Sequence, residues 1–313
     1  MNISVVIPLY NKEKYVGRAI ESVLKQTIPA DDIVVVDDGS VDNSANEVLK
    51  FSDCRINLIR QQNSGEGSTR NRGVAEAKCD LVAFLDADDA WKPDFLLHIQ
   101  RLYNNFPDCG AYATAYEMMM PGNNAILLRF KEIPPTPWIG IIPDFFKLMQ
   151  SGNPFCSSSV AIPKKTFQEL KGFPEKITQG ADRMMWVKLG MKYPIAFSPS
   201  SQTIYHQNVP NSALSSRFEN YSVTANMIDE MLKNREVPFA LVDDLQDYSV
   251  YLKIHRGYHL VMNGRNKEAR ELLGSIGLNR KYRKMKLWWW FWSLMPFSLI
   301  NFMRKLNSKG RIP

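Results

Sequence analysis

Residues 81–94 read LVAFLDADDAWKPD, an apolar run that ends in a cluster of carboxylates. The run predicts a strand that is buried on both faces, as strands of parallel sheets are. Asp86, Asp88 and Asp89 follow it within four residues. Carboxylates this close repel one another, and each raises the cost of ionising its neighbours. The stretch therefore predicts a strand whose end carries a charge cluster that some partner must neutralise.

Three further apolar runs precede this strand: ISVVIPLY at 3–10, DIVVVDD at 32–38 and INLIR at 56–60. Segments with helical spacing separate them, and Asn11 is the expected N-cap of the first. Strands and helices in alternation predict a parallel sheet covered on both faces. Ligands of such sheets bind beyond the carboxyl ends of the strands. We therefore expect four acidic side chains along one edge: Asp37, Asp38, Asp86 and Asp88.

The charge of the chain is unevenly distributed. The formal net charge is +7, yet residues 280–313 carry nine Lys or Arg and no acidic residue. The preceding 279 residues are slightly acidic, so they lack the basic face of a nucleic-acid-binding body. The four cysteines follow no metal or disulfide spacing, which favours reduced thiols in a reducing compartment.

The first strand–helix turn, PLYNKEKYVG, lacks the glycines of a dinucleotide-binding motif, and no P-loop is present. Asp86 and Asp88, with one residue between them, can aim at a common point beyond the strand. Hard carboxylate oxygens suit Mg²⁺ or Mn²⁺ shared with substrate phosphates. The alternative is a solvated turn that caps the helix beginning near Pro93.

Several motifs together resemble the inverting family 2 glycosyltransferases with the GT-A fold. These are VVIPLYN at 5–11, VVVDDGSVDNS at 34–44, QNSGEGSTRNRGVAEA at 62–77 and FLDADDAW at 84–91, with weaker matches in GADRMMWVKL at 180–189 and IYHQ at 204–207. The resemblance implies an α/β, Rossmann-like GT-A fold with a helical C-terminal extension. It also implies transfer of a sugar from a UDP-sugar to an acceptor hydroxyl.

The resemblance and the sequence pattern together predict four segments. A GT-A catalytic domain covers 1–214, with a nucleotide-binding half at 1–107 and an acceptor half at 108–214. A helical extension at 215–279 and a basic, Trp-rich tail at 280–313 follow.

The resemblance assigns the donor site to residues of the first domain half. Asp38 would accept a hydrogen bond from the uracil N–H, and Gly65 would let the backbone approach the nucleotide. Arg70 would place a positive charge near the phosphates, and Asp86 would reach the ribose or the metal. The base would lie against three residues: Pro8, Tyr10 and Asn11.

Asp88 would be the main ligand of Mn²⁺ or Mg²⁺. Asp89 is expected mainly to cap the next helix, with a metal or sugar contact as the alternative. His206 is either a metal or diphosphate contact or a structural residue. Asp182 would be the catalytic base, unless it only caps its helix. The family usually has a second acid before that base, whereas this chain has Ala181.

The tail, KYRKMKLWWWFWSLMPFSLINFMRKL at 281–306, is uncharged from residue 287 to residue 303. On a helical wheel one side is the more polar, although Trp290 and Phe297 also fall there; its polar residues are Lys286, Ser293, Ser298, Asn301 and Arg304. The basic flanks and clustered Trp predict a helix pair lying in an anionic cytoplasmic leaflet. The alternatives are that the tail packs on the body as core, or that it spans the bilayer once.

The expected function is therefore transfer to a glycan or lipid-linked acceptor in cell-surface polysaccharide assembly, at the inner face of the cell membrane. A polyprenyl-phosphate sugar transferase is an alternative, because its acceptor is already an anion and needs no base. A catalytically idle sugar-nucleotide-binding protein is the non-enzymatic alternative.

Overall fold

The protein was analysed as a computed structural model that describes residues 1–120, 122, 124–175, 177, 180–206, 220–277 and 279–301. The chain divides into two compact units, residues 1–215 and 216–313. The domain boundary expected at residue 214 falls within 207–219, outside the described residues. Each unit is described below by itself.

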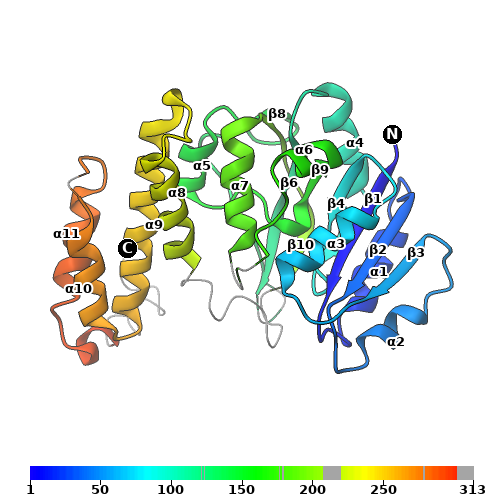
Figure 1. Ribbon diagram of the computed structural model, residues 1–313, viewed down its shortest axis with the longest axis horizontal. Coiled ribbons are helices and arrows are strands. Elements are labelled where there is room, and N and C mark those ends of the chain that lie inside the picture. Colours follow the sequence, from blue (N-terminus) through cyan, green and yellow to red (C-terminus); the bar gives the residue numbers. More distant parts are fainter. Residues whose placement is uncertain are drawn as a thin grey trace. The chain divides into compact units, whose positions relative to one another are not determined.

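The first unit is built on a sheet to which its described residues contribute ten strands (Figure 1). Its first four strands lie in the order β3-β2-β1-β4 and run parallel, which confirms the expected parallel arrangement. Their bounds are β1 (Ile3–Leu9), β2 (Asp32–Asp37), β3 (Ile56–Arg60) and β4 (Leu81–Phe84). Because β1 lies between β2 and β4, the carboxyl ends of these three strands meet at one edge.

The remaining strands make the sheet mixed. β9 (Val160–Pro163) runs antiparallel between β4 and β6 (Ala111–Met120). β10 (Ile195–His206) is parallel to β6, and β5 (Ala90–Trp91) pairs with it in the antiparallel sense. Two short strands, β7 (Asn124–Leu127) and β8 (Gly140–Ile141), pair with β6 and β10.

Helices cover both faces of this sheet because its strands are apolar on both. Odd-numbered β1 residues such as Val5 and Ile7 share a core with α1 (Val16–Leu24) and α4 (Phe95–Asn105). On the other face, Val6 lies against α3 (Glu66–Glu76), where a Cβ at Gly73 would come within 2.3 Å of Val6 Cγ1.

Four further helices belong to this unit. The ring of Phe84, on the α3 face, contacts Phe167 of α6 (Lys164–Glu169). Phe84 also contacts Phe173, and Trp186 of α7 (Ala181–Lys192) packs on that same Phe173 ring. α2 (Ser44–Leu49) follows β2, and α5 (Phe145–Ser151) precedes a 3-10 turn, η1 (Ser157–Ser159), before β9.

The first helix begins later than the sequence predicts. α1 begins at Val16 with Tyr15 as its N-cap, so the expectation that Asn11 caps it is wrong. Asn11 instead has a positive φ of 51° and belongs to the loop after β1. Its amide oxygen Oδ1 accepts a hydrogen bond from the Val41 N–H at 2.9 Å. Asn side chains tolerate this conformation because they can hydrogen-bond locally.

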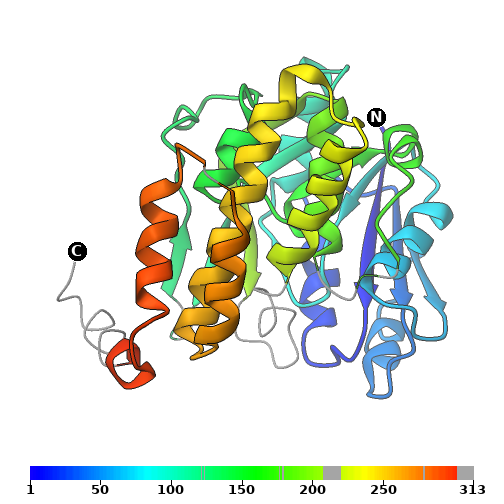
Figure 2. The same ribbon diagram turned by 60° about the vertical axis from the view of Figure 1, so that its left-hand side comes forward.

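The second unit is helical in its described residues, as predicted (Figure 2). Its elements are α8 (Asn220–Lys233), a 3-10 turn η3 (Phe239–Leu241), α9 (Val242–Met262), α10 (Asn266–Ser275) and α11 (Arg283–Trp292). None of the described helices is long and apolar enough to cross a bilayer.

Part of the Trp-rich tail packs within this second unit. Trp289 lies on Tyr258 of α9, with 4.6 Å between the ring centroids. Ile300 is buried beside Leu260 and Val261. The alternative that the tail packs as core is therefore correct for one of its faces. Residues 302–313 of the tail lie outside the described residues.

Candidate active site

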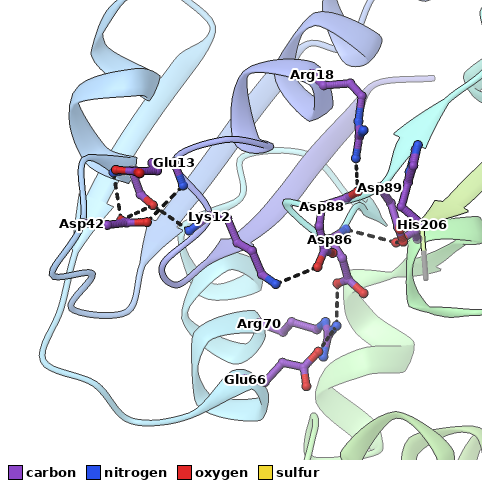
Figure 3. Close-up of polar contacts among 12 residues, drawn as sticks. Lys12, Glu13, Arg18, Asp42, Glu66, Arg70, Asp86, Asp88, Asp89 and His206 are labelled. Atoms are coloured by element: carbon purple, nitrogen blue, oxygen red, sulfur yellow. Dashed lines mark hydrogen bonds and ion pairs between the residues drawn. The ribbon is translucent and has the colours of Figure 1, made fainter. Parts of the chain in front are cut away.

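The acidic residues predicted at strand ends do gather at one edge of the first unit's sheet. Asp38 directly follows β2, and Asp86 and Asp88 follow β4, with β1 between the two strands. Figure 3 shows the carboxylates of Asp86 and Asp88 beside Lys12, which comes from the loop after β1, and Arg70, which comes from α3.

Asp38 organises the loop that leads into α3. Its Oδ1 accepts hydrogen bonds from the Ser64 N–H at 2.9 Å and from Gln61 Nε2 at 2.8 Å. Its Oδ2 accepts the Gly65 N–H at 2.9 Å. Gly65 has φ 88°, a backbone conformation that glycine adopts without strain. A carboxylate offers about four acceptor positions, so one position of Asp38 remains for a ligand N–H.

The residues expected around the nucleotide base have different exposures. Pro8 lies half-buried within β1, while Tyr10 follows the strand and is 47% exposed. Asn11 links this loop to the one after β2, since its N–H also donates to Ser40 Oγ at 3.0 Å. Tyr10 is thus the side chain of this group that can present its ring to a ligand.

Arg70 is paired inside the protein. It is 1% exposed, and its Nη2 lies 2.6 Å from Asp86 Oδ1 and 2.5 Å from Glu66 Oε1. Burial alone would lower the pKa of Arg70, but Asp86 and Glu66 outweigh burial and raise it. Arg70 therefore balances Asp86 in this structure, and its direct contact with a donor phosphate stays a prediction.

Asp86 is held in place from two sides. Its backbone N–H donates to Ser158 Oγ at 3.1 Å, while its side chain meets Arg70. Burial raises the pKa of Asp86 to about 6, with Glu66 and Asp88 adding to the effect and Arg70 opposing it. This carboxyl is costly to ionise without a cation, as its position in a cluster predicts.

Asp88 pairs with a lysine that the sequence reasoning did not identify. Its Oδ2 lies 2.8 Å from Lys12 Nζ, and the two side chains are only 17% and 13% exposed. The Asp88 backbone carbonyl accepts a hydrogen bond from Arg18. Two positive side chains thus reach the same residue, one at its carboxylate and one at its backbone.

Asp89 is an internal brace. It is fully buried, its Oδ1 accepts the His206 N–H at 3.0 Å, and its Oδ2 accepts the Ser158 hydroxyl. Burial raises the pKa of Asp89, and Asp88 and Asp86 raise it further. Both oxygens already hold protein donors and the side chain is fully buried, so the alternative of a metal or sugar contact stays a prediction. Asp89 does not cap α4 either, since Asp94 occupies that N-cap position.

His206 ends β10 beside this brace. Its ring Nδ1 is buried and has no hydrogen-bond partner among the described residues. Burial lowers its pKa, Arg18 lowers it further, and Asp88 acts in the opposite direction. His206 is therefore within electrostatic reach of Asp88, and its contact with a metal or diphosphate stays a prediction.

Asp182 lies in the first turn of α7 and is half-buried. Its Oδ1 accepts the N–H of the next residue, Arg183, at 2.7 Å. It is also close enough to Arg70 to help raise the pKa of that arginine. The structure therefore brings Asp182, from the second half of the unit, into electrostatic contact with the cluster after β4.

The described residues were tested against the expected metal. They contain no group of three or more His, Cys, Asp or Glu side chains placed to hold an ion. Asp86 is paired with Arg70, which leaves Asp88 as the available carboxylate. Mg²⁺ and Mn²⁺ are often held by one or two carboxylates together with substrate phosphates and water. The residues fit a cation that arrives with a diphosphate, provided that Lys12 moves aside.

Three residues of this site carry no sequence signal strong enough to single them out. Lys12 and Arg18 are ordinary charges of a polar loop and an amphipathic helix. Ser158 is one of three consecutive serines, yet its carbonyl oxygen also accepts hydrogen bonds from Trp91 Nε1 at 2.6 Å and Thr203 Oγ1 at 3.1 Å. Only tertiary structure reveals that it joins β4, β5 and β10.

Comparisons with known proteins agree with this geometry. A family model described as glycosyl transferase family 2 matches residues 4–166. An uncharacterized glycosyltransferase of Nostoc sp. is 46% identical over 106 residues, which cover 33% of this chain and 33% of that protein. UDP-Glc:alpha-D-GlcNAc-diphosphoundecaprenol beta-1,3-glucosyltransferase WfgD of Escherichia coli is 41% identical over 90 residues, 28% of this chain and 36% of that protein. The chain thus spans only about a third of the length of these curated relatives.

Among solved structures, residues 1–349 of S. aureus TarS in complex with UDP-GlcNAc are similar to this chain, with a TM-score of 0.69 and 15% identity. The match covers 99% of this chain and 93% of that one. This likeness shows the fold: a GT-A arrangement around a central sheet, with a helical C-terminal part.

Proposed function

The chain belongs to glycosyl transferase family 2, and we propose that it transfers a sugar from a UDP-sugar to an acceptor hydroxyl with inversion at C1. One observation carries this proposal. Asp38, Asp86 and Asp88 stand at neighbouring strand ends, and Asp182 acts electrostatically on Arg70, which holds Asp86. This arrangement supports a nucleotide site with a candidate base near it.

The donor side of the proposal rests on the two loops after β1 and β2. The free acceptor position of Asp38 suits the one N–H of a uracil ring, and the exposed ring of Tyr10 can stack on the base. The glycine at position 65 keeps the loop backbone open to a ribose. UDP-GlcNAc is the ligand in the TarS complex, and the name of WfgD gives UDP-Glc as its donor.

The diphosphate would lie near Asp88 and its basic partners. Lys12 Nζ has one anionic partner and further donor capacity, so it can turn towards a phosphate oxygen. Asp88 would then hold a Mn²⁺ or Mg²⁺ ion, with His206 as a further contact. Such an ion neutralises the charge that develops on the departing diphosphate.

Asp182 would remove the proton from the acceptor hydroxyl. As that oxygen bonds to C1 from the face opposite the nucleotide, the C1–O bond to the diphosphate breaks and UDP leaves with the bonding electrons. A half-buried carboxylate can serve as such a base without a second acid beside it. Ala181 therefore affects acceptor contacts rather than proton transfer.

The acceptor is proposed to be a lipid-linked glycan of polysaccharide biosynthesis, because the name of the similar WfgD describes a diphosphoundecaprenol-linked acceptor for that protein. A polyprenyl-phosphate acceptor, the second candidate, would need no base. The half-buried position of Asp182 near the cluster favours a hydroxyl acceptor.

The proposal is tested by measuring nucleotide release from a panel of UDP- and GDP-sugars with glycan acceptors. We expect acceptor-dependent release of UDP from one or a few UDP-sugars, and none from GDP-sugars. EDTA should abolish release, and added Mn²⁺ or Mg²⁺ should restore it. UDP binding without transfer to any acceptor would instead indicate an idle sugar-nucleotide-binding protein.

A further inference from the structure

The segment 283–301 of the second unit has one face that is fixed against neighbouring helices. Trp292 and Ile300 pack with Leu260 of α9 and Ala269 of α10. The Asn266 side-chain amide donates to the Met295 carbonyl at 2.8 Å. The segment is therefore docked on its own unit and cannot turn freely about its axis.

Of the side expected to be more polar, Lys286 and Ser293 face inward, whereas Ser298 is exposed. Ser293 is fully buried, and its carbonyl accepts a hydrogen bond from Arg270 of α10. Lys286 Nζ donates to the Ile276 carbonyl. These polar contacts lie beside the apolar contacts that Trp292 and Ile300 make with the same helices.

The side that remains exposed is apolar. Its large side chains are each between 40% and 56% exposed, and together they form what we term the exposed apolar face: Leu287, Trp288, Trp290, Phe291, Leu294, Phe297 and Leu299. Leu287 and Phe291 lie one turn apart on the same face of α11. Several large apolar side chains exposed close together in the chain indicate an interaction site.

The charge around this face indicates the kind of partner. Arg283 and Lys284 are exposed in the first turn of α11, and residues 280–301 contain no Asp or Glu. An interface with a second copy related by twofold symmetry places the same patch on both sides. It would bring these cations towards their equivalents without an acid between them. An anionic lipid surface complements the charge, and Trp rings favour the membrane–water interface.

We propose that the exposed apolar face binds an anionic lipid surface, with its Trp and Phe rings at headgroup depth and Arg283 and Lys284 beside lipid phosphates. The segment lies on the membrane rather than across it. This surface matches the inner leaflet of a cell membrane. The proposal concerns binding alone and stands independently of the proposed reaction.

The test is flotation of the full-length protein with vesicles of phosphatidylcholine, with and without phosphatidylglycerol. We expect binding to the anionic vesicles that weakens in high salt but persists. Trp288→Ser/Phe291→Ser should reduce the partition coefficient at least tenfold, because both side chains are about half exposed. Arg283→Gln/Lys284→Gln should reduce binding mainly at low salt.

Phe239→Ser is the matched control, since Phe239 is 96% exposed on η3 of the same unit but lies outside the face. It should bind as the wild type does. Circular dichroism checks that each variant is folded. If Trp288→Ser/Phe291→Ser does not fold, Arg283→Gln/Lys284→Gln still tests the proposal. Wild-type protein that stays with the lipid-free fraction would overturn the proposal. So would a dimer in light scattering that the Ser substitutions dissociate.

Discussion

At the scale of single residues, the carboxylate cluster after β4 is neutralised largely from within the protein. Arg70 pairs with Asp86, Lys12 pairs with Asp88, and Asp89 receives neutral donors. The sequence predicts the need for a partner but not its identity, because Lys12 and Arg70 lie far from the cluster in the chain. The two ion pairs differ in the burial of the basic side chain, which is 1% exposed in Arg70 and 13% exposed in Lys12.

Lys12→Gln separates donor binding from metal binding. If Lys12 contacts the diphosphate and competes with a cation for Asp88, its loss should raise the KM for the donor roughly fivefold, the value of an ion-pair contribution of about 1 kcal/mol. The half-activating Mn²⁺ concentration should fall. Both quantities come from UDP-release kinetics.

Lys14→Gln is the control for this variant, because Lys14 is an exposed lysine of the same loop. It should leave both quantities unchanged. If Lys12→Gln behaves like Lys14→Gln, the Lys12–Asp88 pair has no part in donor or metal binding.

Asp89 offers a test of a brace against a ligand. Asp89→Ala leaves the His206 N–H and the Ser158 hydroxyl without their partner, a cost of at least about 2 kcal/mol. The midpoint of thermal unfolding should fall by roughly 4–8 °C. Asp89→Asn keeps an oxygen that accepts the His206 N–H, and its amide group can donate to the Ser158 hydroxyl. Most of the stability and activity should therefore remain. Loss of activity in Asp89→Asn without loss of stability would point to a ligand role.

At the scale of elements, close packing of α3 on β1 positions the site. Gly73 lets the helix approach so that Arg70, one turn earlier, reaches Asp86 at the end of β4. Asn71 also bonds the Phe173 backbone through both its amide oxygen and its amide nitrogen, at 2.9 Å each. The helix is thus fixed at one side to the sheet and at the other to the segment before α7.

Gly73→Ala should destabilise the first unit by about 1–3 kcal/mol, because its Cβ would overlap Val6 Cγ1 at 2.3 Å. Gly17→Ala in α1 is the control, since its Cβ would meet only Phe51 Cζ at 4.0 Å. It should be neutral or stabilise by about 0.5–1 kcal/mol. Urea unfolding of both variants measures the difference, and equal stabilities would contradict the packing described here.

The parallel strands and the site edge could be predicted because they depend on local patterns. The runs at 3–10, 32–38 and 81–85 are apolar enough to define buried strands, and their order along the chain places the acids at one edge. The start of α1 could not be predicted in this way, because the Asn11 side chain accepts a hydrogen bond from the Val41 N–H, 30 residues away. The role of Ser158 depends on contacts with three distant strands, and the exposed apolar face depends on which side of α11 its neighbours cover.

At the scale of the molecule, catalysis and membrane contact are proposed for different units. The candidate site residues belong to the first unit, and the exposed apolar face belongs to the second. Trp288→Ser/Phe291→Ser should therefore keep the kcat for a water-soluble acceptor. It should lose roughly tenfold or more in rate on a lipid-linked acceptor in anionic vesicles. Equal loss on both acceptors would show that the substitutions act on catalysis itself.

The central claim is that Asp182 removes a proton from an acceptor hydroxyl while the other site residues hold a UDP-sugar. The most direct measurement compares Asp182→Asn with wild type in two assays, UDP binding by calorimetry and sugar transfer by UDP release. We expect unchanged UDP affinity and a kcat that is reduced by about 10²-fold or more, which is the scale of a lost general base. Transfer at the wild-type rate by Asp182→Asn would contradict the claim and place the base elsewhere, or show that the acceptor is already ionised.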